Sequence, residues 1–273
     1  MENTLDIRYN KEALVVQANE LIRSRQDDLS LLEAKLIKLV VSQIVMEDTD
    51  LRTYTCKAVD LANFLNIDTK IIYRDLENLA ASILKKVISV KDTSKVKRNG
   101  EYNYKKFHWV DTFEYYNGTV TIKISEELKP YLLGLNTLFT EYGLDSVLGL
   151  PTPHSIRLLE LLLSYSSLTL VNSPTEFYPH IPKASNEIIF TVEYIKIYFN
   201  CHGKYKNNSD FIKWVIEPSV CGINTHSPSK VSFRTVKEGR SIGYVLFKIN
   251  AWADSDFYNF VRPYIVKDLG ACP

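Results

Sequence analysis

Apolar positions in the first half of the chain recur with helical spacing in some stretches and alternate as in strands in others. Steps of three and four residues predict helices at residues 11–23, 30–46, 58–65, 69–84 and 126–132. Alternation predicts strands at residues 52–56, 86–90, 104–116 and 119–124, with a basic loop at 91–100. Ser30 and Glu33 form a capping box, Asp68 caps the helix at 69–84, and Asn117-Gly118 is a hairpin turn.

The second half repeats this order after a segment that glycine and proline interrupt. Residues 141–153 are therefore the predicted domain boundary, and Pro153 begins a helix at its first position. Residues 171–185 contain three prolines and predict a loop. The remaining pattern predicts a strand at 187–191, helices at 192–200 and from a cap at Ser209, and strands at 230–235 and 244–249.

This internal repeat is the main feature of the sequence. Each half has a strand, a helix, a polar turn, a longer helix and a β-hairpin, which is the order of a winged helix. The predicted fold is therefore α+β, with two tandem winged-helix domains at residues 1–145 and 146–273. Such a unit suits double-stranded DNA, because a helix fits the major groove and a basic wing reaches neighbouring phosphates.

The distribution of charge supports this interpretation more than the net charge does. The 273 residues include 33 Lys and Arg and 32 Asp and Glu, so the net charge of +1 excludes a globally basic protein. Residues 85–106 nevertheless carry eight basic and two acidic side chains. The second half has basic residues around its long helix and its hairpin, at Lys204, Lys206, Lys213, Lys230, Arg234, Lys237, Arg240 and Lys248. Both clusters fall where a winged helix needs them.

Several other classes of protein are disfavoured. No apolar run approaches the ~20 residues of a membrane-spanning helix, and the polar N-terminus is unlike a signal peptide, so we expect a cytoplasmic protein without a membrane partner. Cys201, His202, Cys221 and His226 are zinc-ligand types, but an adjacent Cys-His pair has poor geometry for joint chelation, so we expect no metal. The absence of a phosphate-binding loop and of a His-x-His pair disfavours an enzyme or a cofactor.

Five stretches carry a resemblance to a known family, and together they cover about residues 10–250. They are residues 16–22, 29–36, 154–162 (HSIRLLELL), 205–224 (a Y-x5-F-x3-V-x2-P helix ending in Ile-Asn) and 237–240 (KEGR). In their order and spacing they resemble the iteron-binding plasmid replication initiators, which consist of two winged helices. The chain departs from the family at Gly222, where an acidic residue is common, and at Lys213-Trp214, where two basic residues are common.

The resemblance implies a function that composition and periodicity do not reveal. It implies binding to short direct repeats at a bacterial plasmid origin, and local opening of the duplex with a host initiator and the replicative helicase. It also implies that a monomer binds the repeats, whereas a homodimer represses its own gene and the balance sets copy number. The C-terminal winged helix gives the main repeat contact in such proteins, and the N-terminal one gives a second contact and the dimer interface.

The candidate DNA-binding residues are polar or basic side chains on the longer helices and hairpins, which can reach base edges or phosphates. In the C-terminal domain they are Lys204, Lys206, Asn208, Ser209, Lys213, Lys237 and Arg240. In the N-terminal domain they are Lys70, Tyr73, Arg74, Asn78, Lys95, Lys97 and Arg98. The alternatives are helix capping for Asn208 and Ser209 and solvated charge for the lysines. A place in the core is the alternative for Trp214, which neighbours Phe211 and Val215 on its helix.

Two other functions remain open at this level. A dimeric winged-helix transcriptional regulator without origin function would carry the same pattern. A protein-interaction scaffold would use winged helices that do not touch DNA.

Overall fold

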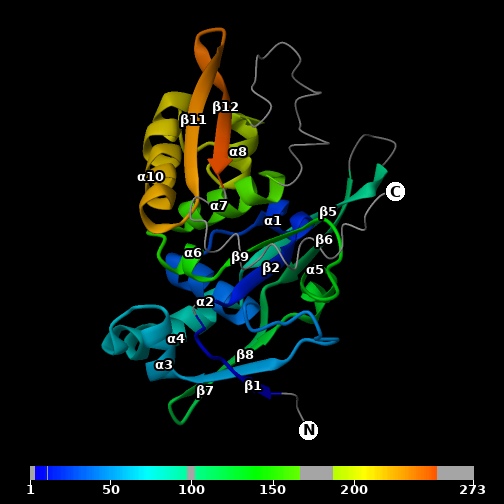
Figure 1. Cartoon of the computed structure of the whole chain (residues 1–273), viewed down its shortest axis with the longest axis vertical. Helices are drawn as coiled ribbons and strands as arrows, with labels where there is room; N and C mark the ends of the chain where they lie inside the picture. The colour runs from blue at the N-terminus through cyan, green and yellow to red at the C-terminus, as the bar shows by residue number, and fades with distance from the viewer. Residues whose placement is uncertain (1–3, 11, 97–101, 167–186, 251–273) are drawn as a thin grey trace, which may run out of the picture.

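The structure is a computed structural model that describes residues 4–10, 12–96, 102–166 and 187–250. The predicted loop at residues 171–185 lies outside the described residues. Figure 1 shows the first half of the chain below, the second half above, and α7 (Pro153–Ser166) where the halves meet.

The first half mixes short helices with several small sheets. It begins with β1 (Thr4–Asp6), β2 (Leu14–Ala18), α1 (Asn19–Arg23), β3 (Arg25–Gln26), α2 (Leu31–Val41), β4 (Thr53–Lys57), α3 (Ala58–Phe64) and α4 (Thr69–Ile83). It continues with β5 (Val87–Val96), β6 (Tyr102–His108), β7 (Val110–Tyr116), β8 (Thr119–Ile124), η1 (Glu126–Leu128), α5 (Lys129–Leu132), β9 (Phe139–Gly143) and α6 (Asp145–Leu148). After α7 come β10 (Ile188–Thr191), α8 (Val192–Tyr198), α9 (Asn208–Phe211), the π-helical η3 (Ile212–Ile216), α10 (Glu217–His226), β11 (Lys230–Glu238) and β12 (Ser241–Asn250).

Local signals in the sequence set several of these boundaries as predicted. The Ser30 hydroxyl accepts a hydrogen bond from the Glu33 amide at 3.2 Å, and the Glu33 carboxylate accepts one from the Ser30 amide at 2.6 Å. Asp68 caps α4 by accepting from the Lys70 amide at 2.7 Å. Asn117 and Gly118 have φ of 47° and 78°, the left-handed conformation that a two-residue hairpin turn requires.

Three predicted elements are wrong. The strand expected at 104–116 is two strands, β6 and β7, which belong to different sheets. Residues 11–23 do not form one helix, because residues 14–18 form β2, which pairs antiparallel with β9. The β-branched pair Val15-Val16 suits this strand, and only residues 19–23 are helical. The basic loop expected at 91–100 is in part an extended strand, because β5 continues to Val96 opposite β6.

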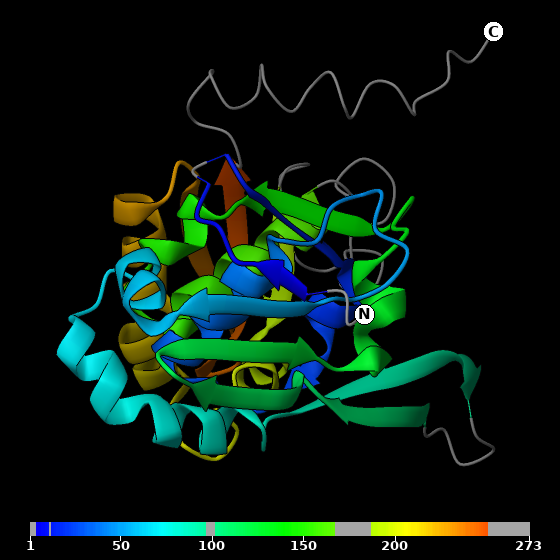
Figure 2. The ribbon, with the colours of Figure 1, turned by 90° about the horizontal axis from the view of Figure 1, so that it is seen from below.

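Each half contains a winged helix, but the basic stretch at residues 85–106 is not the wing of the first half. The second winged helix consists of β10, α8, the long helix formed by α9, η3 and α10, and the wing β11–β12, and β10 pairs with β12. In the first winged helix β4, α3 and α4 correspond to these elements, and β4 pairs with β8, which pairs with β7. The first wing is therefore β7–β8. The basic stretch at 85–106 lies mainly in a separate sheet of β3, β5 and β6, and Figure 2 shows that β5 and β6 project from the body on the side away from α4.

α7 packs against elements of both halves. It contacts α1, α2 and β9 on one side and α10, β10 and β12 on the other. The main hydrophobic cluster consequently runs without a break from Ile7 through Leu158, Leu159 and Leu162 to Phe247. The predicted boundary between residues 145 and 146 stays a prediction, but the two winged helices share one core.

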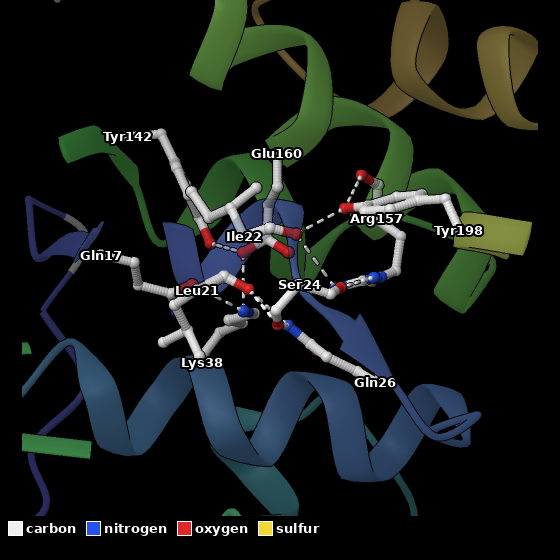
Figure 3. Close-up of polar contacts among 10 residues, drawn as sticks. All are labelled: Gln17, Leu21, Ile22, Ser24, Gln26, Lys38, Tyr142, Arg157, Glu160 and Tyr198. Atoms are coloured by element: carbon white, nitrogen blue, oxygen red, sulfur yellow. Dashed lines mark hydrogen bonds and ion pairs between the residues drawn. The ribbon is translucent and has the colours of Figure 1, made fainter. Parts of the chain in front are cut away.

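A buried ion pair lies at this junction, and Figure 3 shows the side chains around it. The Lys38 ammonium on α2 lies 2.6 Å from a Glu160 carboxylate oxygen on α7, and the two side chains are 5% and 1% exposed. Gln17 accepts a further hydrogen bond from Lys38 at 3.2 Å, and the Tyr142 hydroxyl donates one to Glu160. Burial lowers the pKa of Lys38, and the Glu160 charge opposes that shift. Each of the two charges therefore offsets the free-energy cost of burying the other.

A second contact joins α8 to the first half. The Arg157 guanidinium lies 4.0 Å from the centre of the Tyr198 ring and donates to the Ser24 carbonyl at 3.2 Å. The Tyr198 hydroxyl donates to the Ile22 carbonyl at 3.0 Å, as Figure 3 shows. Side chains of the second half thus satisfy backbone carbonyls at the end of α1, which fixes the second winged helix against the first.

We predict that Glu160→Leu lowers the free energy of unfolding by about 3–5 kcal/mol, because it leaves the Lys38 charge buried and unpaired. Urea denaturation followed by circular dichroism measures the change. The double variant Lys38→Met, Glu160→Leu should recover most of the loss, because no charge then remains buried. Equal stability of the single and double variants would contradict the assignment.

Candidate nucleic-acid interface

The long helix of the second winged helix has an unusual winding that follows from its sequence. Its buried side chains come in adjacent pairs four residues apart, at Phe211-Ile212, Val215-Ile216 and Ser219-Val220, followed by Ile223. In an α-helix, a step of four residues overshoots one turn by about 40°, so such a stripe drifts off the core. The wider turn of η3 keeps the stripe buried. The helix begins at Asn208, with Asn207 as its N-cap residue, so the predicted cap at Ser209 is wrong.

The winding places Ser209, Lys213 and Trp214 on the exposed face of this helix. Trp214 is 63% exposed, so the alternative that places it in the core is wrong. The Lys213 ammonium lies 5.1 Å from the centre of the Trp214 ring, within the range of a cation–π contact. A cation and an aromatic ring are therefore presented together to solvent.

The other candidates lie at or before the start of this helix, where one faces solvent and two make contacts within the protein. Lys206 is exposed. Asn208 faces inward, where it accepts from the Lys196 ammonium at 2.7 Å and donates to the Ile242 carbonyl on β12 at 2.6 Å. Lys204 lies 3.3 Å from the Asp28 carboxylate of the first half. Asn208 thus ties the helix start to the wing, and Lys204 joins the two halves.

The tip of the second wing is basic and exposed. Lys237 and Arg240 flank the β11–β12 turn, where Gly239 has a φ of 63° that favours glycine. Lower in the wing, Arg234 is held by Glu187, with guanidinium–carboxylate distances of 2.8 Å. The cations that face solvent at the tip are the two that the sequence analysis selected.

In the first winged helix, α4 buries Ile72, Leu76, Leu79 and Ile83 and exposes its four candidates, Lys70, Tyr73, Arg74 and Asn78. The Arg74 guanidinium is hydrogen-bonded to Asp75 at 2.8 and 2.9 Å. Tyr73 packs edge-on against Tyr115 of the wing, with ring centres 6.5 Å apart. The candidates therefore share one solvent face, although Arg74 has a carboxylate beside it.

The first wing differs in charge from the second. Residues 110–124, which form the first wing, contain Asp111, Glu114 and one cation, Lys123, which forms an ion pair with Glu126 at 3.5 Å. On the separate β5–β6 hairpin Lys105 forms an ion pair with Glu127, and the Lys106 ammonium lies 5.3 Å from the centre of the Tyr104 ring. The structure does not describe Lys97 and Arg98, and it does not describe the side chain of Lys95.

An open groove of about 650 Å³ lies between α4 and the turn after α8. Asn78, Ser82 and Lys85 line it from the first winged helix, Arg25 from β3, and Asn200 from the second half. Asp27 and Asp28 line it as well, but the Asp27 carboxylate accepts a hydrogen bond from the Val87 amide, and the Asp28 carboxylate accepts from Asn200 and Lys204. Among the described residues, the exposed Arg25 and Lys85 side chains have no hydrogen-bond or ion-pair partner. The sequence analysis counted Lys85 in a basic cluster but selected neither residue, because only the tertiary fold brings β3 beside α4 and Asn200.

The four zinc-ligand types are not gathered into a site. Cys201 is buried, whereas Cys221 is exposed on α10, and His202 lies 2.5 Å from Glu193. Within residues 4–10, 12–96, 102–166 and 187–250, no group of three or more His, Cys, Asp or Glu is placed to hold a metal ion. In the same part of the chain, no helix is long and apolar enough to span a bilayer.

Comparison with known proteins accounts for this arrangement. Residues 14–163 match the family described as "Initiator Replication protein, WH1", and residues 191–249 match "Initiator Rep protein, WH2". The chain belongs to this initiator family. The initiator is 26% identical over 242 residues to a "Replication initiation protein" of Escherichia coli, which covers 87% of this chain and 70% of that protein.

A solved structure confirms the fold of the initiator. The Pi initiator protein, determined in complex with iteron DNA, superposes with a TM-score of 0.64 at 18% sequence identity. The match covers 91% of this chain and 100% of that chain. The predicted α+β fold with two tandem winged helices is therefore confirmed, as is the resemblance to the plasmid initiators.

We predict that Asn208→Ala destabilises the initiator by about 1–3 kcal/mol, because the Lys196 ammonium and the Ile242 carbonyl lose a partially buried partner. The neighbouring Ser209→Ala, on the exposed face, should change stability by less than about 0.5 kcal/mol and serves as the matched control. Chemical denaturation of both variants measures the difference. An equal effect of the two changes would rule out the structural role of Asn208.

Proposed function

We propose that this initiator binds direct repeats of double-stranded DNA at a plasmid origin and starts replication there, by binding rather than by catalysis. The observation that carries the proposal is the second winged helix, whose exposed helix face and basic wing tip lie where a base contact and a phosphate contact are needed. Membership of the initiator family supports the origin as the site of action. The relative Pi, solved in complex with iteron DNA, supports repeats as the target.

The two winged helices contribute unequally in this proposal. The exposed face with Lys206, Ser209 and Lys213 enters the major groove, and Lys237 and Arg240 hold the flanking phosphates. The face of α4 makes a second contact. Because the first wing carries Asp111 and Glu114, it cannot grip a phosphate backbone as the second wing does. This difference supports the C-terminal winged helix as the main reader of the repeat.

The groove between the two contact surfaces supports a continuous path for one DNA strand. Asn78 lies on the candidate face of α4 and also lines the groove, and Asn200 brings the second half to its other side. Arg25 and Lys85 then supply cations to the backbone between the two helices. Lys204 lies at the same junction, where its ammonium group forms an ion pair with Asp28.

The remaining parts of the proposal follow from the family resemblance. We propose that a monomer binds the repeats in the bacterial cytoplasm and that a homodimer, formed through the N-terminal winged helix, represses the gene. A host initiator and the replicative helicase are the proposed partners in opening the origin.

Gel shift on tandem direct repeats from the DNA beside the gene tests this function. We expect a series of shifted bands on direct repeats and weaker binding to an inverted repeat of the same half-site. The double variant Lys213→Ala, Arg240→Ala should bind roughly ten- to hundredfold more weakly, because it loses a contact from the helix and one from the wing. The double variant Arg8→Ala, Lys129→Ala removes the same charge elsewhere and is the control.

Three results would contradict parts of the proposal. Absence of any shift at low salt would indicate a scaffold that does not touch DNA. Preference for the inverted repeat would indicate a transcriptional regulator. Unchanged binding by Lys213→Ala, Arg240→Ala would remove the second winged helix as the main contact.

We predict that substitutions in the groove change the salt dependence of DNA binding rather than its sequence preference. Arg25→Ala, Lys85→Ala should weaken binding uniformly across DNA sequences and reduce the slope of log affinity against log salt by about 2, because each phosphate contact contributes about 0.9. Titration at several salt concentrations, on repeat and on unrelated duplexes, measures the slope. An unchanged slope would show that the backbone bypasses the groove.

A further inference from the structure

Trp214 is the one large side chain on the long helix of the second winged helix that the fold leaves unexplained. It is 63% exposed, whereas Trp109 in the core is 1% exposed. The side chains of Phe211 and Val215, on either side of it, are buried without its help. An indole ring held in water contributes little to folding. This ring stands on the helix face that the proposed function places against DNA.

The surroundings of Trp214 are unlike a protein-docking patch. Between residues 208 and 226 it is the single exposed large apolar side chain. Its exposed neighbours on the helix are Lys213, Glu217, Pro218 and Cys221. A surface that binds another protein presents a large contiguous apolar patch, whereas the one large apolar group on this helix face is a single ring, flanked by the small Pro218 and Cys221 and by the charged Lys213 and Glu217.

The geometry also fixes how the ring is presented. The Lys213 ammonium lies over one face of the indole, 5.1 Å from the ring centre, while 63% of the residue remains exposed to solvent. The π-helical turn of η3 puts Lys213 and Trp214 together between two buried pairs, in the N-terminal part of the helix. In helix-turn-helix proteins this part of the recognition helix contacts base edges.

The major groove offers one apolar group against which a single aromatic ring can pack. The major groove displays hydrogen-bond donors and acceptors from every base pair, but the C5-methyl group of thymine is its apolar element. A ring edge packed on that methyl group removes both from water. The neighbouring ammonium meanwhile suits an adjacent phosphate or guanine.

We propose that Trp214 determines sequence specificity by packing its ring against the C5-methyl group of a thymine in the major groove. This inference rests on the proposed function, because it requires the long helix to enter DNA. It adds that the site read by this chain contains a thymine opposite Trp214.

Replacement of thymine by uracil tests the contact, because it removes the methyl group and keeps the base pair. Duplexes that the wild-type protein selects from a random library serve as probes, with each thymine replaced in turn. We expect one position at which wild-type binding falls about fourfold, the equivalent of about 0.8 kcal/mol for one buried methyl group. Trp214→Ala should bind the thymine and uracil forms of that position equally, and Trp214→Phe should retain part of the difference.

Tyr116→Ala is the matched control, because Tyr116 is another exposed aromatic residue, 72% exposed, on the first wing. It should show the same uracil penalty as the wild type. Thermal denaturation should be unchanged by Trp214→Ala, since the ring lies outside the core.

The outcomes separate this inference from the function on which it rests. If the wild type selects no preferred duplex, the proposed function fails. If it selects one, but no thymine shows a penalty or Trp214→Ala retains every penalty, the contact proposed here fails and the proposed function stands.

Discussion

The Glu160 carboxylate on α7 holds the two halves of the initiator in one arrangement. It lies 2.6 Å from the Lys38 ammonium and accepts a hydrogen bond from Tyr142, and all three side chains are buried. A buried charge tolerates little displacement, because any shift leaves an ion without a partner in a medium that cannot solvate it. The position of α7 on the first half is therefore specified more sharply than apolar packing alone would specify it.

The placement of the second winged helix depends on that helix. α7 carries Arg157, which with Tyr198 ties α8 to the carbonyls at the end of α1, and it packs directly on α10. The separation between the exposed faces of α4 and of the α9–α10 helix is consequently fixed by the core. A reader with two rigidly spaced faces measures the distance between two stretches of DNA as well as their sequence.

The sequence predicted the features that depend on neighbours along the chain. The Ser30 capping box, the Asp68 cap and the Asn117-Gly118 turn involve contacts within a few residues, and the structure confirms each. The basic stretch at 85–106 was wrongly placed in the first wing because strand pairing is not local: the partner of β4 is β8, and the β5–β6 hairpin intervenes. Residues 14–18 fit a helix by spacing, but β9, far along the chain, pairs with them as a strand.

At the candidate site, too, the sequence predicted exposure along single elements but not contacts between distant residues. Lys213, Lys237 and Arg240 were found because helix and hairpin positions expose charge in a predictable way. Asn208 looked like a reader of bases, but its amide is engaged with Lys196 and Ile242. A place in the core was the alternative for Trp214 because it neighbours Phe211 and Val215 along the helix. The strict four-residue repeat from Phe211 to Ile223 was the available sign of the π-helical turn that exposes it.

The contrast between the acidic first wing and the basic second wing gives each molecule a polarity. In the proposed function that asymmetry gives one orientation on each repeat, because the base contacts of the second winged helix are met in one direction of the duplex, whereas its phosphates are equivalent in both directions. Copies on tandem sites then all point the same way, so the leading end of one faces the trailing end of the next. Contacts between neighbours in such an array are heterologous and can extend along the DNA, unlike the closed contact of a two-fold dimer.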